Sequence, residues 1–338
     1  MWPFNLIARR QARRLFDLSA GFVYSQVYMS CVALDWFNRL AGGPVAIATL
    51  ADEARLPIAA AQRLLRAAHT LQLTEPRAAD SVALGPLGAA MIGDPGIAAM
   101  AAHHHLLYAD MSDPLGLLRG EKSDTALSRY WGYATSATPE DLPADDVAPY
   151  SALMAASQPM IAEQVLAALS MKPYEHILDI GGGVGAFLDA VHARYPHLRR
   201  TLFDLPGVIA ARGAREDDVT AVGGSFLGSE LPAGADLISL VRIVHDHDDD
   251  VVLKLLSNIR QIIPKHGTLL IAEPMAGTGG AETVGDVYFG FYLLAMGSGR
   301  ARTLNEINEL LGASGFSPAS RHKTPVPLIA SVLTARPI

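Results

Sequence analysis

The most informative stretch of the sequence is His176–Ala186, which joins an apolar run to an aspartate and a cluster of glycines. Glycines at 181, 183 and 185 would let a tight turn bring the backbone close to a ligand. Asp179 would stand at the carboxyl end of the preceding strand, where open α/β sheets bind their ligands. Its carboxylate would repel the pyrophosphate of a dinucleotide and attract a positively charged amino group. S-adenosylmethionine carries such a group, so the segment predicts a methyltransferase that binds this cofactor through Asp179, Gly181 and Gly183.

Two other interpretations of the same glycines stay open at this point. Residues 181–186 also fit the G-x-G-x-x-G/A fingerprint of dinucleotide binding, and a glycine-rich turn without a ligand has the same appearance. The next apolar run, 200–205, carries Asp204 near its end, at about the distance where an acid bonds ribose hydroxyls. Both cofactor types use such an acid, so Asp204 supports nucleoside binding without separating a methyltransferase from an NAD-dependent oxidoreductase. Asp179 and the lack of a second mononucleotide-binding half favour the methyltransferase.

A histidine and a glutamate follow the ends of two later apolar runs. His245 comes directly after the run 235–244, and Glu273 comes directly after the run 267–272. Parallel strands would bring both side chains to the sheet edge that carries the glycine turn. A glutamate on one imidazole nitrogen would fix the tautomer and leave the other nitrogen to accept a proton. Methyl transfer to an alcohol needs such a base, so we expect His245 to be the general base and Glu273 its orienting acid.

A metal site and a structural histidine are the alternatives for this cluster. His-x-His followed by aspartates has the spacing of some metal ligands. Asp246, Asp248 and Asp249 also suit the start of a helix, where they act as caps and as favourable charges. We therefore expect no metal ion.

These residues require an α/β fold in which strands alternate with helices. Strands are expected at 176–180, 200–205, 219–226, 235–243, 267–273 and 328–335, with helices between the first five. This alternation predicts a Rossmann-like, doubly wound parallel sheet that is covered on both faces.

The first part of the chain, residues 1–150, has a mostly helical pattern. Between Val45 and Ile92, short helices, a longer one at 58–73 and an extended pair around 81–84 predict a winged-helix arrangement. Its arginines are balanced by acids, which disfavours a transcriptional regulator that binds DNA. A role in dimerisation and substrate enclosure is the better interpretation.

A domain boundary is expected in the stretch 135–149, which is rich in proline, aspartate and small residues. The chain would then consist of a winged-helix-like dimerisation and substrate-lid domain at 1–148 and a methyltransferase domain at 149–338.

Composition limits the classes of function further. The chain has 338 residues, half of them hydrophobic, and a net charge of −7, which argues against a general nucleic-acid binder. A single cysteine, Cys31, leaves no internal disulfide and fits a reducing compartment. No apolar run reaches the length of a membrane span, and the first arginines follow the short apolar stretch, unlike those of a secretory signal. A cytoplasmic enzyme is expected.

The first sixteen residues combine aromatic and basic side chains. Trp2 and Phe4 precede four arginines, at 9, 10, 13 and 14. Such a helix either packs on a partner subunit or lies in a membrane interface, and the first of these is favoured. Weak peripheral membrane contact, lost on deletion of residues 1–14, is the alternative.

Taken together, these motifs resemble the S-adenosylmethionine-dependent O-methyltransferases typified by the caffeate and acetylserotonin enzymes. The matching segments are Leu178–Gly185 for the cofactor motif, Phe203–Pro206 for the ribose, Gly223–Phe226 for the adenine, Ile243–Asp246 for the catalytic histidine and Ala272–Pro274 for the orienting acid. The resemblance adds Ser225 and Phe226 to the cofactor-binding residues, and the dimerisation role of the winged helix predicts a homodimer. Ser225 stands where many relatives have an adenine-binding aspartate, and Ala301 stands where plant relatives have a second acid near the histidine.

Within this family, the chain looks most like the bacterial hydroxyneurosporene/demethylspheroidene branch, which methylates a tertiary hydroxyl of an acyclic carotenoid. The segments that carry this likeness are 103–110, 117–121 and 286–300. The likeness implies a long lipophilic substrate contacted by Tyr288, Phe289, Tyr292 and Met296. From the residues alone, the apolar run 289–296 fits a pocket lining and an ordinary buried helix face equally well. A phenolic or other aromatic metabolite is the alternative acceptor.

Overall fold

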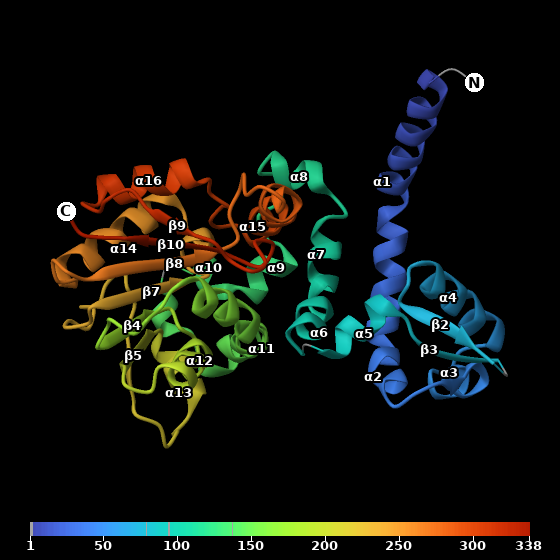
Figure 1. Cartoon of the computed structure of the whole chain (residues 1–338), viewed down its shortest axis with the longest axis horizontal. Helices are drawn as coiled ribbons and strands as arrows, with labels where there is room; N and C mark the ends of the chain where they lie inside the picture. Colours follow the sequence, from blue (N-terminus) through green and yellow to red (C-terminus); the bar gives the residue numbers. More distant parts are fainter. Residues whose placement is uncertain (1–2, 79, 94, 137) are drawn as a thin grey trace. The chain divides into compact units, whose positions relative to one another are not determined.

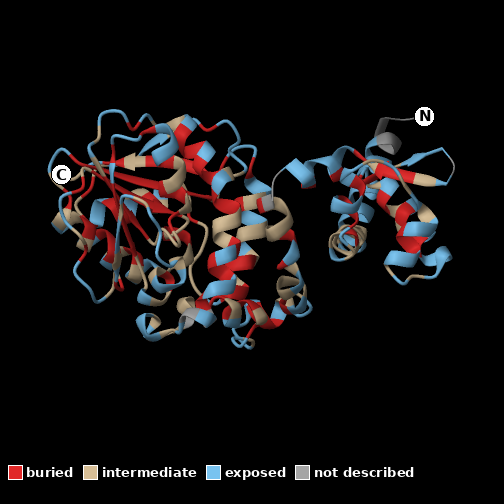
Figure 2. Ribbon diagram, turned by 90° about the horizontal axis from the view of Figure 1, so that it is seen from below, coloured by how far each residue is buried: buried red, intermediate tan, exposed pale blue. Residues whose placement is uncertain are grey.

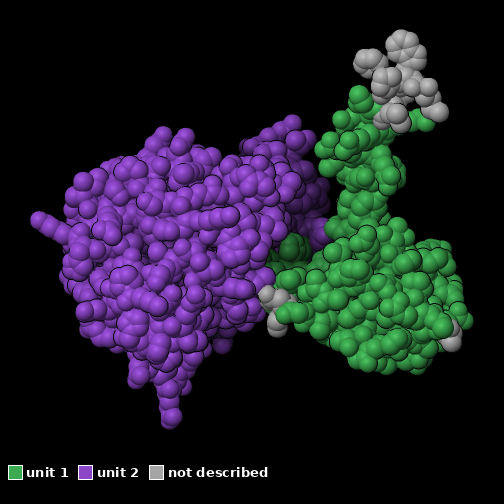
Figure 3. All heavy atoms as spheres, viewed as in Figure 1, with its two compact units in different colours: residues 1–104 green, residues 105–338 purple. Residues whose placement is uncertain are grey.

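The computed structural model describes residues 3–78, 80–93, 95–136 and 138–338 (Figure 1). The chain divides into two compact units, residues 1–104 and 105–338, which are coloured separately in Figure 3. The boundary expected between residues 148 and 149 lies inside a continuous helix, α11 (Ala144–Ala168). Prolines 149 and 159 both lie within this helix, so the proline-rich composition concealed its start.

Unit 1 contains a long N-terminal helix and a winged-helix core. Its helices are α1 (Pro3–Ala33), α2 (Trp36–Ala41), α3 (Ile47–Glu53), α4 (Ile58–Thr70), α5 (Pro86–Gly93) and α6 (Pro95–Ala102). Its strands β1 (Val45–Ala46), β2 (Thr74–Arg77) and β3 (Ser81–Leu84) form an antiparallel sheet in the order β1-β3-β2. Trp36, Phe37 and Leu65 are buried together in its core. The predicted winged-helix arrangement is therefore present.

Unit 2 is built on a seven-stranded sheet in the order β6-β5-β4-β7-β8-β10-β9. The strands are β4 (His176–Ile180), β5 (Arg199–Asp204), β6 (Val219–Gly223), β7 (Leu237–Val241), β8 (Thr268–Glu273), β9 (Ser320–His322) and β10 (Ser331–Ala335). The pairs from β6 to β8 are parallel, as expected, and the expected α/β class is correct.

Three details of the α/β unit differ from the expectation. β10 pairs antiparallel with β8 and with β9, a short strand that the sequence pattern did not predict. β9 has three residues, none of them buried, so its pattern lacks the apolar signal of an interior strand. The third and fourth strands are also not joined by the expected helix. Residues 224–236 form an irregular connection in its place.

Helices cover both faces of the sheet (Figure 2). Its five inner strands, β5, β4, β7, β8 and β10, are largely buried, whereas the edge strands β6 and β9 contain no buried residue. α14 (Asp249–Ile262) and α16 (Leu304–Ala313) pack on the face that carries Leu178 and Ile180. α11 and α12 (Ala186–Arg194) pack on the opposite face.

The remaining helices of the chain are short. They are α7 (His104–Asp110), α8 (Pro114–Leu118), α9 (Ala126–Tyr130), α10 (Gly132–Thr135), α13 (Pro206–Arg212), α15 (Gly290–Met296), the 3₁₀ turns η1 (Pro139–Asp141) and η2 (Val244–Asp246), and the π-helix η3 (Thr283–Phe289). None of the helices described is long and apolar enough to cross a bilayer.

Candidate active site

The glycine turn connects β4 to α12 and forms one wall of a cavity of about 250 Å³ in unit 2. Gly181 and Gly183 adopt φ values of +71° and +61°, which favour glycine. A Cβ at Gly182 would collide with the Asp179 carboxylate. The corresponding position at Gly183 is open, with no heavy atom within 4 Å, so the turn presents bare backbone to the cavity.

Asp204, at the end of β5, lies in the wall of this cavity. Its carboxylate accepts hydrogen bonds of 2.7 Å from the backbone N–H groups of Gly183 and Leu205. Burial raises the pKa of Asp204 to about 6, although the two hydrogen bonds oppose the rise. The carboxylate is thus mainly ionised at neutral pH and available at the sheet edge as an acceptor.

Asp179 occupies a different position from the one expected. It is 1% exposed and lies beneath Gly182 instead of in the cavity wall. Its Oδ1 accepts a 2.6 Å hydrogen bond from Ser239, and burial raises its pKa to about 7. Side chains alternate between the two faces of a strand, and residue 179 points to the face that α11 and α12 cover. The expected direct contact with a cofactor amino group is therefore not what this position offers.

Ser225 and Phe226 follow β6 and line the same cavity as the glycine turn. The Ser225 hydroxyl accepts a hydrogen bond of 3.3 Å from the Leu227 N–H. The Phe226 ring meets the His247 ring edge to face, with centroids 5.2 Å apart. Two aromatic rings therefore stand next to each other in the cavity wall.

Arg242 is a cavity residue that the sequence analysis missed. Its guanidinium donates to the Ser157 hydroxyl at 2.7 Å, to the Met154 carbonyl at 3.0 Å and to the Gln158 side chain. Its backbone has φ +58°, an uncommon value for a residue other than glycine. A single cation near the carboxyl end of the mainly apolar run 235–244 was the available signal.

His245 and Glu273 lie together, as the sequence analysis expected, and both are buried. The Glu273 Oε2 atom lies 3.3 Å from His245 Nδ1 and accepts a 3.0 Å hydrogen bond from the His245 backbone N–H. On the other side of the ring, His245 Nε2 lies 3.1 Å from Asp246 Oδ1. Tyr133 donates a 2.7 Å hydrogen bond to the second Asp246 oxygen. The imidazole is thus enclosed by two carboxylates, and Asp246 was not predicted to take part.

This enclosure sets the charge of His245. Burial lowers its pKa, but the contacts with Asp246 and Glu273 outweigh burial and raise the pKa to about 10. The ring is therefore protonated at neutral pH in this arrangement. Asp246 lines the cavity, whereas His245 does not, so the carboxylate stands between the ring and the cavity.

The four residues expected to contact the substrate are in η3 and α15, outside the cavity wall. The Phe289 ring lies 5.6 Å from the His245 ring, and Tyr288 packs edge to face on Phe289. Tyr292 packs against both aromatic rings, and its hydroxyl accepts a 2.8 Å hydrogen bond from Trp131. Met296 is 1% exposed. An aromatic cluster therefore adjoins His245, with Met296 buried at the end of the same helix.

In the part of the chain that the structure describes, no group of three or more histidine, cysteine, aspartate or glutamate side chains is arranged to hold a metal ion.

Comparison with known proteins identifies the family of the chain. The O-methyltransferase domain family matches residues 111–317. The demethylspheroidene O-methyltransferase of Cereibacter sphaeroides is 39% identical over 98% of this chain and 89% of its own length. The enzyme of the same name from Rhodobacter capsulatus is 38% identical over 98% and 84%.

Among solved structures, human N-acetylserotonin methyltransferase in complex with S-adenosylmethionine has a TM-score of 0.82 at 23% identity, covering 97% of both chains, and thus shares the fold. LaPhzM has a TM-score of 0.81 at 26% identity, covering 97% of this chain and 99% of its own. The chain therefore belongs to the O-methyltransferase family and is an S-adenosylmethionine-dependent O-methyltransferase.

Proposed function

We propose that the methyl acceptor is the hydroxyl of a lipophilic small molecule, specifically the tertiary hydroxyl of an acyclic carotenoid. Two relatives that are similar over nearly the whole chain carry the name demethylspheroidene O-methyltransferase. The observation that carries the proposal is the aromatic cluster of Tyr288, Phe289 and Tyr292 beside His245. Such a surface suits an apolar chain better than a charged metabolite.

The cofactor fits the residues of the cavity. The open side of Gly183 and the Asp204 carboxylate would accommodate its ribose, and Ser225 and Phe226 would flank its adenine. The Arg242 guanidinium would face its carboxylate. We assign Gly181 and Asp179 an indirect part, since Asp179 supports the turn from below. When bound, the cofactor supplies a methyl group on a sulfonium centre.

His245 is proposed as the general base, with Glu273 as the residue that orients it. The ring accepts a proton only when neutral, and in the arrangement described Asp246 keeps it protonated. An acceptor hydroxyl must therefore replace the Asp246 carboxylate at Nε2, and the proton that Nε2 carries must first pass to Asp246 or to water. Nε2 can then take the hydroxyl proton while the oxygen receives the methyl group. The Glu273 contact with Nδ1 would stabilise the imidazolium that forms.

The proposed substrate class can be tested directly. We expect the purified protein to methylate hydroxylated acyclic carotenoids in detergent faster than a matched set of phenols, with S-adenosylmethionine labelled in the methyl group. Faster turnover of the phenols would overturn the carotenoid assignment and support the alternative aromatic acceptor.

The role of Asp204 in cofactor binding predicts a loss of affinity in Asp204→Ala. Removing an acceptor for two ribose hydroxyls should weaken S-adenosylmethionine binding in calorimetry by about 10- to 100-fold. Asp189→Ala is the matched control, because that acid pairs with Arg215 on the surface of α12. Equal affinities of the two variants would remove Asp204 from the site.

The base assignment predicts a large loss of turnover in His245→Gln. We expect kcat to fall by about 10²- to 10⁴-fold, whereas the exposed His192→Gln on α12 should leave it unchanged. A kcat of His245→Gln within threefold of the wild type would show that His245 is not the base.

A pH dependence follows from the raised pKa of His245 in the free enzyme. The ring is protonated below about 10, so kcat/KM for the acceptor should rise with pH toward that value. Asp246→Asn removes a charge that raises this pKa. The rise of kcat/KM on the acidic side of its pH profile should therefore move to lower pH. An unmoved rise would contradict the proposed contact between Asp246 and Nε2.

The homodimer is also a proposal, and we place its interface on α1. Leu15, Leu18 and Phe22 recur at helical spacing along α1 and are 64%, 79% and 69% exposed. A second copy of the chain would bury this stripe, and the membrane surface is the competing partner. Leu18→Glu should yield monomers in light scattering, unlike Gln62→Glu on α4. An unchanged mass together with lost vesicle binding would favour the membrane instead.

A further inference from the structure

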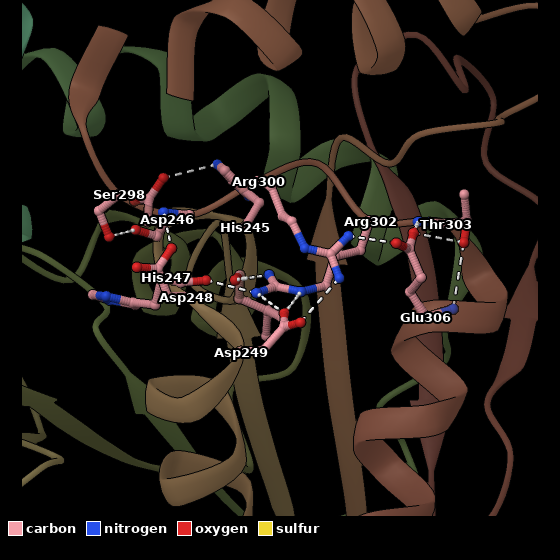
Figure 4. Close-up of polar contacts among 12 residues, drawn as sticks. His245, Asp246, His247, Asp248, Asp249, Ser298, Arg300, Arg302, Thr303 and Glu306 are labelled. Atoms are coloured by element: carbon pink, nitrogen blue, oxygen red, sulfur yellow. Dashed lines mark hydrogen bonds and ion pairs between the residues drawn. The ribbon is translucent and has the colours of Figure 1, made fainter. Parts of the chain in front are cut away.

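Arg302 is a cation that is 0% exposed, one of the largest side chains fully buried in the described chain. A buried guanidinium is costly unless it is paired and its hydrogen bonds are made. Arg302 donates to the Val244 carbonyl at 2.6 Å and to the His247 carbonyl at 2.7 Å. It also donates twice to Asp249 Oδ1, at 2.8 and 2.7 Å (Figure 4). All of these acceptors belong to residues 244–249.

The acceptors of Arg302 bracket His245. Val244 precedes the histidine by one residue, and His247 follows it by two. Fixing both carbonyls constrains the backbone on each side of the ring that contacts Glu273. The same loop carries His247 into the wall of the cofactor cavity. One buried side chain therefore restrains two groups at the active site.

The residues just before Arg302 also contact the loop 244–249. The Ser298 hydroxyl donates to the Asp246 carbonyl at 2.9 Å, and the Gly299 N–H donates to Asp248 Oδ1 at 3.0 Å. A Cβ at Gly299 would collide with the His245 carbonyl, so this close approach requires glycine. Segment 298–302 thus packs along the loop 244–249 and forms hydrogen bonds with it at several positions.

Arg300 offers a matched comparison within the same network. It contacts Asp249 at 3.1 Å and Glu306 at 2.5 Å, but its side chain is 43% exposed. No hydrogen bond described for Arg300 reaches the backbone of residues 244–247. Exposed ion pairs of this kind contribute little to stability.

We propose that Arg302 is a positioning residue for methyl transfer, which keeps the loop 244–249 in the shape that orients His245 toward Glu273 and places His247 at the cofactor cavity. This inference rests on the proposed role of His245 as the base. Arg302 acts through the loop and does not itself contact the reacting atoms.

The test compares Arg302→Lys with Arg300→Lys in the full chain. An ammonium group keeps the charge but cannot satisfy acceptors on three residues in the fixed geometry of a guanidinium. We expect Arg302→Lys to lower kcat by about 10- to 100-fold, because small displacements of a catalytic group have effects of that order. Arg300→Lys should keep kcat within about twofold of the wild type.

A second readout separates positioning from general damage. Asp246 and Glu273 are the charged groups in contact with the His245 ring. If the loop relaxes, these contacts lengthen, and the NMR titration midpoint of His245 in the ligand-free protein should fall by about one pH unit in Arg302→Lys. Arg300→Lys should leave the midpoint in place. A lower kcat with an unmoved midpoint would overturn the proposal.

Asp249→Ala covers the case in which Arg302→Lys does not fold. It removes two of the four hydrogen bonds of Arg302 at a half-exposed residue, and a smaller midpoint shift in the same direction is expected. An unchanged titration midpoint of His245 in a folded Asp249→Ala protein would contradict the positioning role of Arg302. The midpoint is measured without turnover, so this result is independent of whether His245→Gln shows His245 to be the base.

Discussion

The contact of His245 with two carboxylates is the constraint on which the proposed chemistry depends. Glu273 Oε2 lies 3.3 Å from Nδ1 and Asp246 Oδ1 lies 3.1 Å from Nε2, and the two carboxylates together raise the pKa of the ring to about 10. In the proposed mechanism, the first contact orients the base and the second keeps it protonated at neutral pH. Displacement of Asp246 by the acceptor would couple substrate binding to the release of the base. A tertiary alcohol is a weak acid, so in this mechanism its proton leaves as the methyl group arrives, and Glu273 stabilises the imidazolium that forms.

The arrangement of the sheet explains why these groups meet. Parallel strands β4, β5, β7 and β8 end at the same edge. That edge brings the glycine turn, Asp204, His245 and Glu273 together although almost a hundred residues separate the first from the last. The segment 298–302 then fixes the loop after β7 from outside the sheet. The proposed cofactor site and the proposed base thus share one sheet edge, and the loop that carries His245 is held by one buried arginine.

Much of this could be predicted from the sequence, because apolar runs, glycines and the polar residues that follow the runs carry local signals. The limits are equally physical. β9 has no buried residue, and its antiparallel pairing with β10 depends on partners distant in the chain. The position of Asp179 beneath Gly182 depends on which face of β4 it occupies, which the motif does not specify. Asp246 was interpreted as a helix cap, and its contact with Nε2 requires the three-dimensional shape of the loop.

The most direct test is to follow the His245 imidazole by NMR in three states: ligand-free, with S-adenosylhomocysteine, and with S-adenosylhomocysteine plus a hydroxylated carotenoid. The account predicts a titration midpoint near 10 without ligands and a midpoint at or below neutral pH once the acceptor is bound. A midpoint that stays high in the complete complex, while the enzyme turns over rapidly at neutral pH, would contradict it.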